Sequence, residues 1–310
     1  MILNTGCRTD IPAYYSDWFY NRIREGFVCT RNPYHPNQVI RYRLDPKVVD
    51  ILCFCTKNPA PMLPRLSELD DFRQFWFVTV TPYGREIEPF VPDCGKVMQS
   101  VSQLSEKVGA KAVGWRYDPI FITEKYSMDF HIKSFERMAS TMAGKVSFCV
   151  ISFIDLYEKT KRNFPSVRAV STLEQAALME AFVKIGMRYG IPIRTCCENA
   201  ALAEFGADVS GCMTKAVLEK AADCRLRVPR SKKSTRSQCN CLLGADIGMY
   251  NTCPHGCIYC YANYDRKTVE RNIRRHDPAS PFLIGGAQPG DTVIEARQES
   301  YIDRQLTLFE

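Results

Sequence analysis

The stretch from Val146 to Cys197 decides the fold class, through VSFCVISFI (146–154), LEQAALMEAFVKIGMRYG (173–190) and IPIRTCC (191–197). The first and last parts are short apolar runs rich in β-branched residues, which is typical of buried strands. The middle part has the length of a helix, and Gly190 closes it. A strand, a helix and a second strand in this order indicate a parallel sheet.

The same alternation runs outward along most of the chain. We expect strands near Ile2–Cys7, Val49–Thr56, Phe75–Thr81, Ala112–Tyr117, Val146–Ile154 and Ile191–Cys197. Helices are expected at Ser16–Glu25, Ala60–Asp70, Gly95–Val108, Met128–Ala143, Leu173–Tyr189 and, with an interruption, Ala200–Ala222. Six successive βα units predict an α/β fold of the incomplete TIM type, a (β/α)6 barrel.

This pattern divides the chain into four parts. Residues 1–222 form the predicted partial barrel, with residues 27–43 as an excursion before the second strand. A basic linker (223–238) leads to a cysteine-rich module (239–265), which we expect to close over the barrel mouth. Residues 266–310 are predicted to be a basic and flexible tail, because 277–291 are rich in Pro, Gly and small residues.

Composition limits the class of protein. Hydrophobic residues make up 45% of the 310 residues and charged residues 24%, which is ordinary for a soluble globular protein. The N-terminus lacks a basic segment followed by a long apolar run, and no stretch approaches the roughly 20 apolar residues of a membrane span. We therefore expect a cytoplasmic protein. Its 15 cysteines, an odd number, argue for thiols and metal ligands over a disulfide framework.

Positive charge gathers on both sides of the cysteine-rich module. The net charge is +7, and the stretch RLRVPRSKKSTR (225–236) has no acidic residue. A second group comprises Arg266, Lys267, Arg271, Arg274 and Arg275. These segments suit a polyanionic partner such as nucleic acid. A solvated linker and a solvated helix face are the other interpretation.

Polar residues recur where the predicted strands end. They are Arg8, Thr9, Asp10, Thr56, Lys57, Asn58, Thr81, Arg116, Tyr117, Asp118, Asp155, Glu198 and Asn199. In TIM-type barrels the chemistry gathers at this edge, so the set outlines one polar mouth. Each residue taken alone is also typical of a helix cap or a turn.

The segment CNCLLGADIGMYNTCPHGCIYC (239–260) carries the residues most typical of metal ligands. Cys253, Cys257 and Cys260 have CxxxCxxC spacing, which lets three thiolates wrap one face of a four-iron cluster, with Gly256 easing the turn. One iron then has no local ligand. Cys239 or Cys241 would close the cluster if either reached that iron, and five thiols are also compatible with tetrahedral zinc.

Residues 253–263, CPHGCIYCYAN, resemble the cluster motif of radical S-adenosylmethionine (SAM) enzymes, with Tyr259 just before the last cysteine. The YCYAN context is most similar to the spore photoproduct lyase branch. In radical SAM enzymes this motif follows the first barrel strand, a place that RTDIPAYY (8–15) occupies here. Together with TKNP (56–59) and WRYDP (115–119), the whole sequence resembles an uncharacterised bacterial family with a radical-SAM-like C-terminus.

The resemblance implies a [4Fe-4S] cluster, SAM and an electron donor, but TKNP replaces the GGE-like segment that binds the SAM amino group. We expect Lys57 or Arg116 to pair with the methionine carboxylate, and Asp118 or Glu198 with the amino or ribose groups. Asn58 and Tyr259 complete the predicted cofactor pocket, and Tyr117 is a candidate hydrogen-atom donor. His255 is expected to shape the loop without binding metal.

The last residues resemble a peptide that docks on the DNA sliding clamp, through Gln305, Leu306, Leu308 and Phe309. Packing of these residues as a terminal strand is the alternative. The sequence thus predicts a radical SAM-like enzyme acting on nucleic acid, with repair or modification of DNA as the expected role. Two alternatives stay open: a SAM-independent nucleic-acid-associated protein with a zinc or closed cluster, and a radical SAM-like enzyme for a small molecule.

Overall fold

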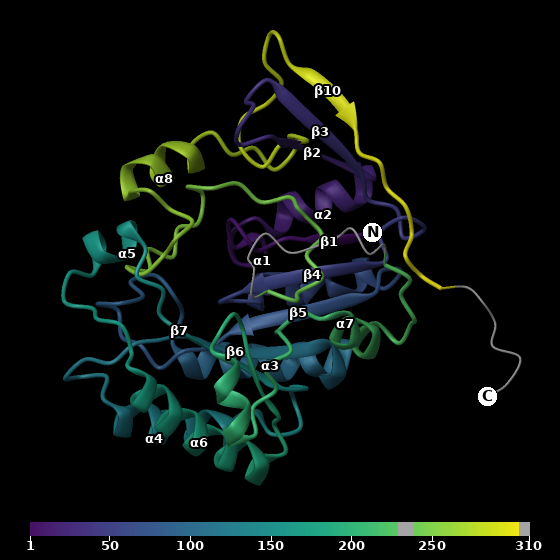
Figure 1. Ribbon diagram of the computed structural model, residues 1–310. Coiled ribbons are helices and arrows are strands. Elements are labelled where there is room, and N and C mark those ends of the chain that lie inside the picture. The colour runs from purple at the N-terminus through teal and green to yellow at the C-terminus, as the bar shows by residue number, and fades with distance from the viewer. Residues whose placement is uncertain (229–238, 304–310) are drawn as a thin grey trace, which may run out of the picture.

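A seven-stranded parallel sheet forms the centre of the computed structural model, which describes residues 1–228 and 239–303 (Figure 1). Its strand order is β8-β7-β6-β5-β4-β1-β9. The bounds are β1 Ile2–Asn4, β4 Ile51–Thr56, β5 Gln74–Thr79, β6 Val113–Ile120, β7 Cys149–Phe153, β8 Ile193–Thr195 and β9 Ala245–Asp246. All six predicted strands are present, and they lie side by side in chain order. The short β9 was not predicted.

The helices follow the predicted pattern with two differences. Those that the sequence predicted are α2 (Ser16–Glu25), α3 (Cys94–Val108), α4 (Met128–Met142), α6 (Thr172–Tyr189) and α7 (Lys215–Ala222). The segment Ala60–Leu69 is a kinked 3-10 helix, because Pro64 inside it lacks an N–H and crowds the preceding turn. The predicted helix from Ala200 is split into a 3-10 turn, Ala200–Phe205, and α7.

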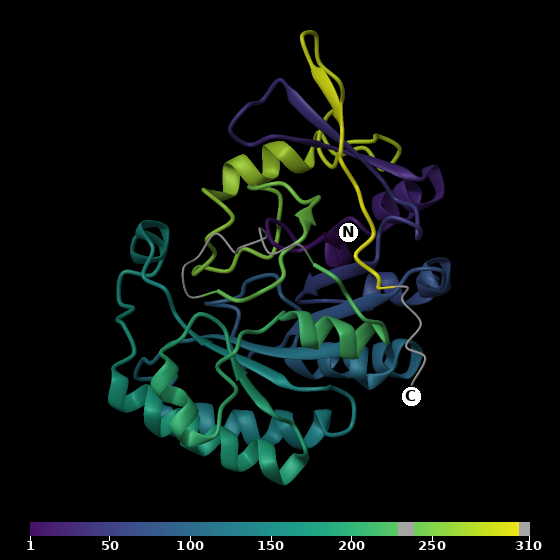
Figure 2. The same cartoon turned by 45° about the vertical axis from the view of Figure 1, so that its right-hand side comes forward.

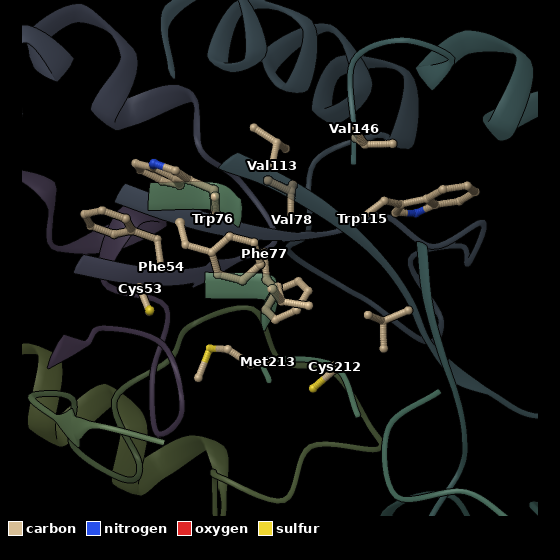
Figure 3. Close-up of a cluster of buried hydrophobic side chains, with 14 of the residues drawn as sticks. Cys53, Phe54, Trp76, Phe77, Val78, Val113, Trp115, Val146, Cys212 and Met213 are labelled. Carbon is tan, nitrogen blue, oxygen red and sulfur yellow. The ribbon is translucent and has the colours of Figure 1, made fainter. Parts of the chain in front are cut away.

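Two faces of the sheet have different neighbours. Alternate residues of β5 point to opposite sides, so Trp76 and Phe77 diverge in Figure 3. On the helix side, Trp115 stacks on Phe135 of α4 with 4.8 Å between ring centroids. Figures 1 and 2 show α4 and α6 on this side, whereas the chain from residue 239 runs over the opposite, inner side.

A smaller sheet covers one end of the molecule. The predicted excursion is an antiparallel hairpin of β2 (Phe27–Arg31) and β3 (Gln38–Arg43), and β10 (Thr292–Glu295) pairs in parallel with β3. The segment predicted to be a flexible tail thus supplies a helix, α8 (Arg266–Ile273), and a strand. Short helices α1 (Ile11–Tyr14) and α5 (Glu158–Asn163) complete the fold.

The main sheet is open in the described part of the chain, where no ladder joins its edge strands β8 and β9. The α/β class is confirmed, with one parallel sheet flanked by helices. Most of the basic linker (229–238) and the clamp-like residues Gln305, Leu306, Leu308 and Phe309 lie outside the described residues. Among those that are described, no helix is long and apolar enough to cross a membrane.

Candidate metal centre

A cavity of about 270 Å³ lies at the carboxyl edge of the main sheet. The ends of β4, β5, β6 and β7 and the loops after β1, β4, β7 and β8 form its walls together with the cysteine loop, which we define as residues 253–263. Its charged lining residues are Arg8, Asp10, Lys57, Arg116, Asp118 and Asp155. Its cysteines are Cys7, Cys55, Cys196, Cys253, Cys257 and Cys260. Strand ends that are distant in sequence therefore meet the CxxxCxxC motif in one place.

The three cysteines of the motif face this cavity from one short loop. They also line a second cavity of about 710 Å³, so the cysteine loop forms a wall between the two spaces. Gly256 has φ of +71°, a left-handed conformation that glycine adopts without strain, and this reverses the chain between Cys253 and Cys257. The N–H of Ala262 donates a hydrogen bond to Sγ of Cys260 at 3.3 Å.

The arrangement fits a cluster better than a single ion. Within residues 1–228 and 239–303, no group of three or more His, Cys, Asp or Glu side chains is arranged to hold a metal ion as it stands. A four-iron cluster binds each thiolate at a different iron, so its ligands need to face a shared space. Cys253, Cys257 and Cys260 do so. Burial raises the pKa of Cys253 and of Cys257, and a bound cation would favour their thiolates.

His255 anchors the cysteine loop to the start of the chain. Its Nε2 lies 2.8 Å from a carboxylate oxygen of Asp10, and its Nδ1 lies 3.0 Å from the hydroxyl of Tyr14. Asp10 also accepts hydrogen bonds from the N–H groups of Ala13 at 3.1 Å and Lys57 at 2.8 Å. Both nitrogens of His255 are therefore used within the protein, in agreement with the predicted role in shaping the loop.

Lys57 belongs to a buried network that supports the same loop. Its Nζ lies 2.8 Å from Oε1 of Glu88, which also accepts hydrogen bonds from the hydroxyls of Thr81 and Tyr259. Burial lowers the pKa of Lys57, but the carboxylate of Glu88 raises it, so that the pKa lies above its usual value. Lys57 and Tyr259 line the cavity, whereas Asn58 does not and instead accepts a hydrogen bond from the N–H of Ala60.

Strand β6 places two of its three predicted site residues at the cavity. Arg116 and Asp118 form an ion pair on the inner face, with the Arg116 guanidinium 5.4 Å from the centroid of Phe77. Tyr117 points to the opposite face, because successive side chains of a strand alternate. Its buried hydroxyl lies 2.9 Å from Nδ1 of His131 in the helix-side core. Tyr117 therefore does not line the cavity.

Glu198 lies behind the cavity wall. Its Oε1 accepts hydrogen bonds from the hydroxyl of Ser152 and the N–H of Phe153, both at 2.9 Å. Ser152 and Phe153 line the cavity, whereas Glu198 does not. Burial raises the pKa of Glu198 to about 7. The carboxylate is thus placed to position Ser152 rather than to contact a ligand itself.

Cys239 and Cys241 do not line the cavity. Sγ of Cys241 instead lies 3.2 Å from Sγ of Cys212, which lies 3.3 Å from Sγ of Cys196. Hydrogen bonds from the thiols of Cys196 and Cys212 lower the pKa of Cys241. This structure therefore separates the CxC pair from the CxxxCxxC motif.

Sequence reasoning missed several residues of the site. Cys55 and Cys196 were not singled out, although they stand at strand ends, the position that singled out the polar residues. Asp246 of β9 was also missed; it accepts hydrogen bonds from the N–H of Cys7 and from Nε of Arg8, both at 2.8 Å. Two buried polar atoms, the Thr9 hydroxyl and Asn263 Oδ1, have no hydrogen-bond partner among the described residues. Both residues line the cavity.

A family model described as "Domain of unknown function (DUF1848)" matches residues 2–262. The chain belongs to the DUF1848 family. The match contains the whole main sheet and ends two residues after Cys260, so both the cavity and the CxxxCxxC motif lie within the DUF1848 region. A search of curated proteins gives no match.

Proposed function

We propose that the protein is an iron–sulfur enzyme of the radical SAM type that acts on nucleic acid. The observation that carries this proposal is the position of Cys253, Cys257 and Cys260. All three face one cavity at the carboxyl ends of parallel strands, where polar side chains from the ends of five strands converge. In this proposal the three thiolates hold a [4Fe-4S] cluster and leave one iron accessible from the cavity.

When bound, the cluster would supply the electron that cleaves SAM, and an external electron donor would be needed to reduce the cluster. The residues of the chain bind and orient SAM and the substrate. We assign Arg116 and Asp118 to the charged groups of SAM, because both line the cavity, side by side on β6 as an ion pair. Thr9 and Asn263 offer buried polar atoms without partners in the described chain. Lys57 is assigned to supporting the loop through Glu88.

Aromatic and basic side chains around both cavities favour a nucleic acid substrate. Arg162 lies 5.0 Å from the ring centroid of Tyr264, and Arg266 lies 5.1 Å from that of Phe90. Exposed aromatic residues that line the two cavities are Tyr14, Phe90, Tyr157, Tyr261 and Tyr264. Aromatic faces beside cations form the usual platform for unpaired bases.

The strand order supports the finer description of the fold as an incomplete barrel. Six strands follow one another in chain order, and the inner face is filled from the amino end by Phe75, Phe77 and Phe148, with 4.7 Å between the first two ring centroids. Layers of side chains below a polar mouth are the internal organisation of TIM-type barrels.

The decisive experiment is anaerobic purification, followed by electron paramagnetic resonance of the reduced protein with and without SAM. We expect a cluster signal that SAM changes, together with formation of 5′-deoxyadenosine. A signal indifferent to SAM would reduce the proposal to a closed cluster, and zinc without sulfide would contradict it.

Substrate class is tested separately by fluorescence anisotropy with single-stranded oligonucleotides at two salt concentrations. If the protein contacts phosphate groups, its affinity for the oligonucleotide must fall as the salt concentration rises. Tyr264→Ala should weaken binding about tenfold, equivalent to about 1.4 kcal/mol of stacking. Tyr34→Ala, which removes a tyrosine that is 86% exposed on the hairpin loop, is the matched control. Equal affinities in the two variants would favour a small-molecule substrate.

The clamp-docking motif is a separate proposal, which rests on the sequence alone. Deletion of residues 305–310 should abolish binding to the sliding clamp and leave oligonucleotide binding unchanged. Full clamp binding by the truncated chain would contradict it.

A further inference from the structure

A second group of cysteines lies apart from the CxxxCxxC motif. Sγ of Cys212 is 3.3 Å from Sγ of Cys196 and 3.2 Å from Sγ of Cys241. Cys212 and Cys241 are buried, Cys196 is half-buried, and none of the three is in a disulfide. Cys239, two residues from Cys241, is half-buried and packs against the same core. We name Cys196, Cys212, Cys239 and Cys241 the edge cysteines.

These residues come from three segments that meet at the open side of the main sheet. Cys196 directly follows β8, which is one edge strand. Cys241 precedes β9, the other edge strand, and Cys212 lies in the loop before α7. Figure 3 shows Cys212 and Met213 on the inner side of the sheet, on the same side as Phe77. The edge cysteines therefore connect two strands that no ladder joins in the described chain.

The two sulfur separations among Cys196, Cys212 and Cys241 are close to those of a thiolate metal site, although the side chains are not arranged to hold an ion as they stand in the described chain. Four sulfurs placed 2.3 Å from a zinc ion at tetrahedral corners are about 3.8 Å apart. The observed separations of 3.2 and 3.3 Å are about half an ångström shorter, a difference that small rotations about the Cα–Cβ bonds remove. A disulfide would require one pair to approach by more than an ångström, to about 2.05 Å.

The surroundings of the sulfurs have two further features of metal sites. The N–H of Met213 donates a hydrogen bond to Sγ of Cys241 at 3.3 Å, as backbone N–H groups do to metal-bound thiolates. Cys197 has φ of +58°, a left-handed conformation that is strained for a residue other than glycine. Backbone strain next to Cys196 fits a position in which the direction of the side chain matters for function.

We propose that Cys196, Cys212, Cys239 and Cys241 bind a single tetrahedral metal ion of the zinc class, which staples the two edges of the sheet together. Binding releases the thiol protons, because the thiolates are the ligands. This site is independent of the cluster proposed above. It assigns to Cys239 and Cys241 a role in a second centre, whose ion closes the open side of the sheet near the cavity.

The proposal is tested on the full chain, purified anaerobically, by measuring zinc, iron and sulfide together. We expect one zinc ion per chain in addition to the iron. Cys241→Ser and Cys239→Ser should lose most of the zinc, whereas Cys257→Ser should lose iron and retain zinc. Cys94→Ser, which changes a half-buried cysteine on α3, should retain both.

A measurement on the unmutated chain covers the case in which a variant fails to fold. Cobalt in place of zinc should give the intense sulfur-to-cobalt absorption of a tetrahedral thiolate site. Zinc content that is unchanged in Cys241→Ser, a cobalt spectrum typical of oxygen ligands, or a Cys212–Cys241 disulfide in the anaerobic protein would each overturn the proposal. Loss of zinc only in the Cys257 variant would overturn it as well.

Discussion

Replacement of Lys57 by methionine tests whether this lysine supports the cysteine loop or binds the cofactor. Its Nζ lies 2.8 Å from Glu88, with the two side chains 13% and 3% exposed. Removal of one partner from a buried ion pair costs about 3–5 kcal/mol, because the other charge stays buried and uncompensated. Glu88 keeps the hydroxyl donors of Thr81 and Tyr259, so we expect a loss near 3 kcal/mol for Lys57→Met.

The assay is anaerobic urea unfolding at pH 7 of Lys57→Met, Glu88→Gln and the double variant. The glutamine oxygen can still accept from Thr81 and Tyr259, so the double variant should recover at least half of the loss. Iron content should fall in Lys57→Met, since Tyr259 precedes the proposed ligand Cys260 in the chain. A loss below about 1 kcal/mol combined with weaker SAM binding would refute this reasoning and restore the cofactor role predicted from the sequence.

Three further predictions concern stability and loop anchoring. The pKa of Glu198 is about 7 in the folded protein, against an ordinary 4.5, so between these values the folded state keeps a carboxyl proton that the unfolded chain releases. The free energy of unfolding should therefore fall by up to about 3 kcal/mol from pH 4.5 to 7.5 and stay lower at higher pH. Glu198→Gln should flatten this dependence in urea unfolding, and an unchanged slope would contradict the assignment. Tyr117→Phe should lower the free energy of unfolding by about 1–2 kcal/mol, because it removes the hydrogen-bond partner of His131. Iron content and SAM binding should not change. Loss of turnover at full iron content would instead show that Tyr117 belongs to the site. Asp10→Ala should lower iron content in reconstituted protein, because His255 loses its anchor, whereas retention of full iron would show that the loop is held by other contacts.

Strands within buried apolar runs were predictable from the sequence, and strands without such a run were not. Strand β5, Gln74–Thr79, lies between two neighbours in the sheet and has a continuous apolar run from Phe75 to Val78. Strand β9 has only two residues, and all four residues of β10 are exposed, so neither shows a hydrophobic pattern. Their pairing depends on partners far away in the chain, which spacing does not reveal.

The site divides in the same way. Cys253, Cys257 and Cys260 are close in sequence, so their spacing alone indicated a shared ligand. Cys212 lies 16 positions after Cys196 and 29 before Cys241, separations that match no ligand pattern. Tyr117 was misplaced because its neighbours Arg116 and Asp118 face the cavity, and strand alternation turns the residue between them away.

Iron and acid-labile sulfide per chain, measured in the anaerobically reconstituted protein and in Cys257→Ser, show whether Cys253, Cys257 and Cys260 hold a cluster. We predict about four iron and four sulfide in the protein and a loss of both in the variant, with Cys94→Ser unchanged. Stoichiometric zinc without sulfide, or iron that Cys257→Ser retains in full, would contradict the assignment of Cys253, Cys257 and Cys260 as cluster ligands.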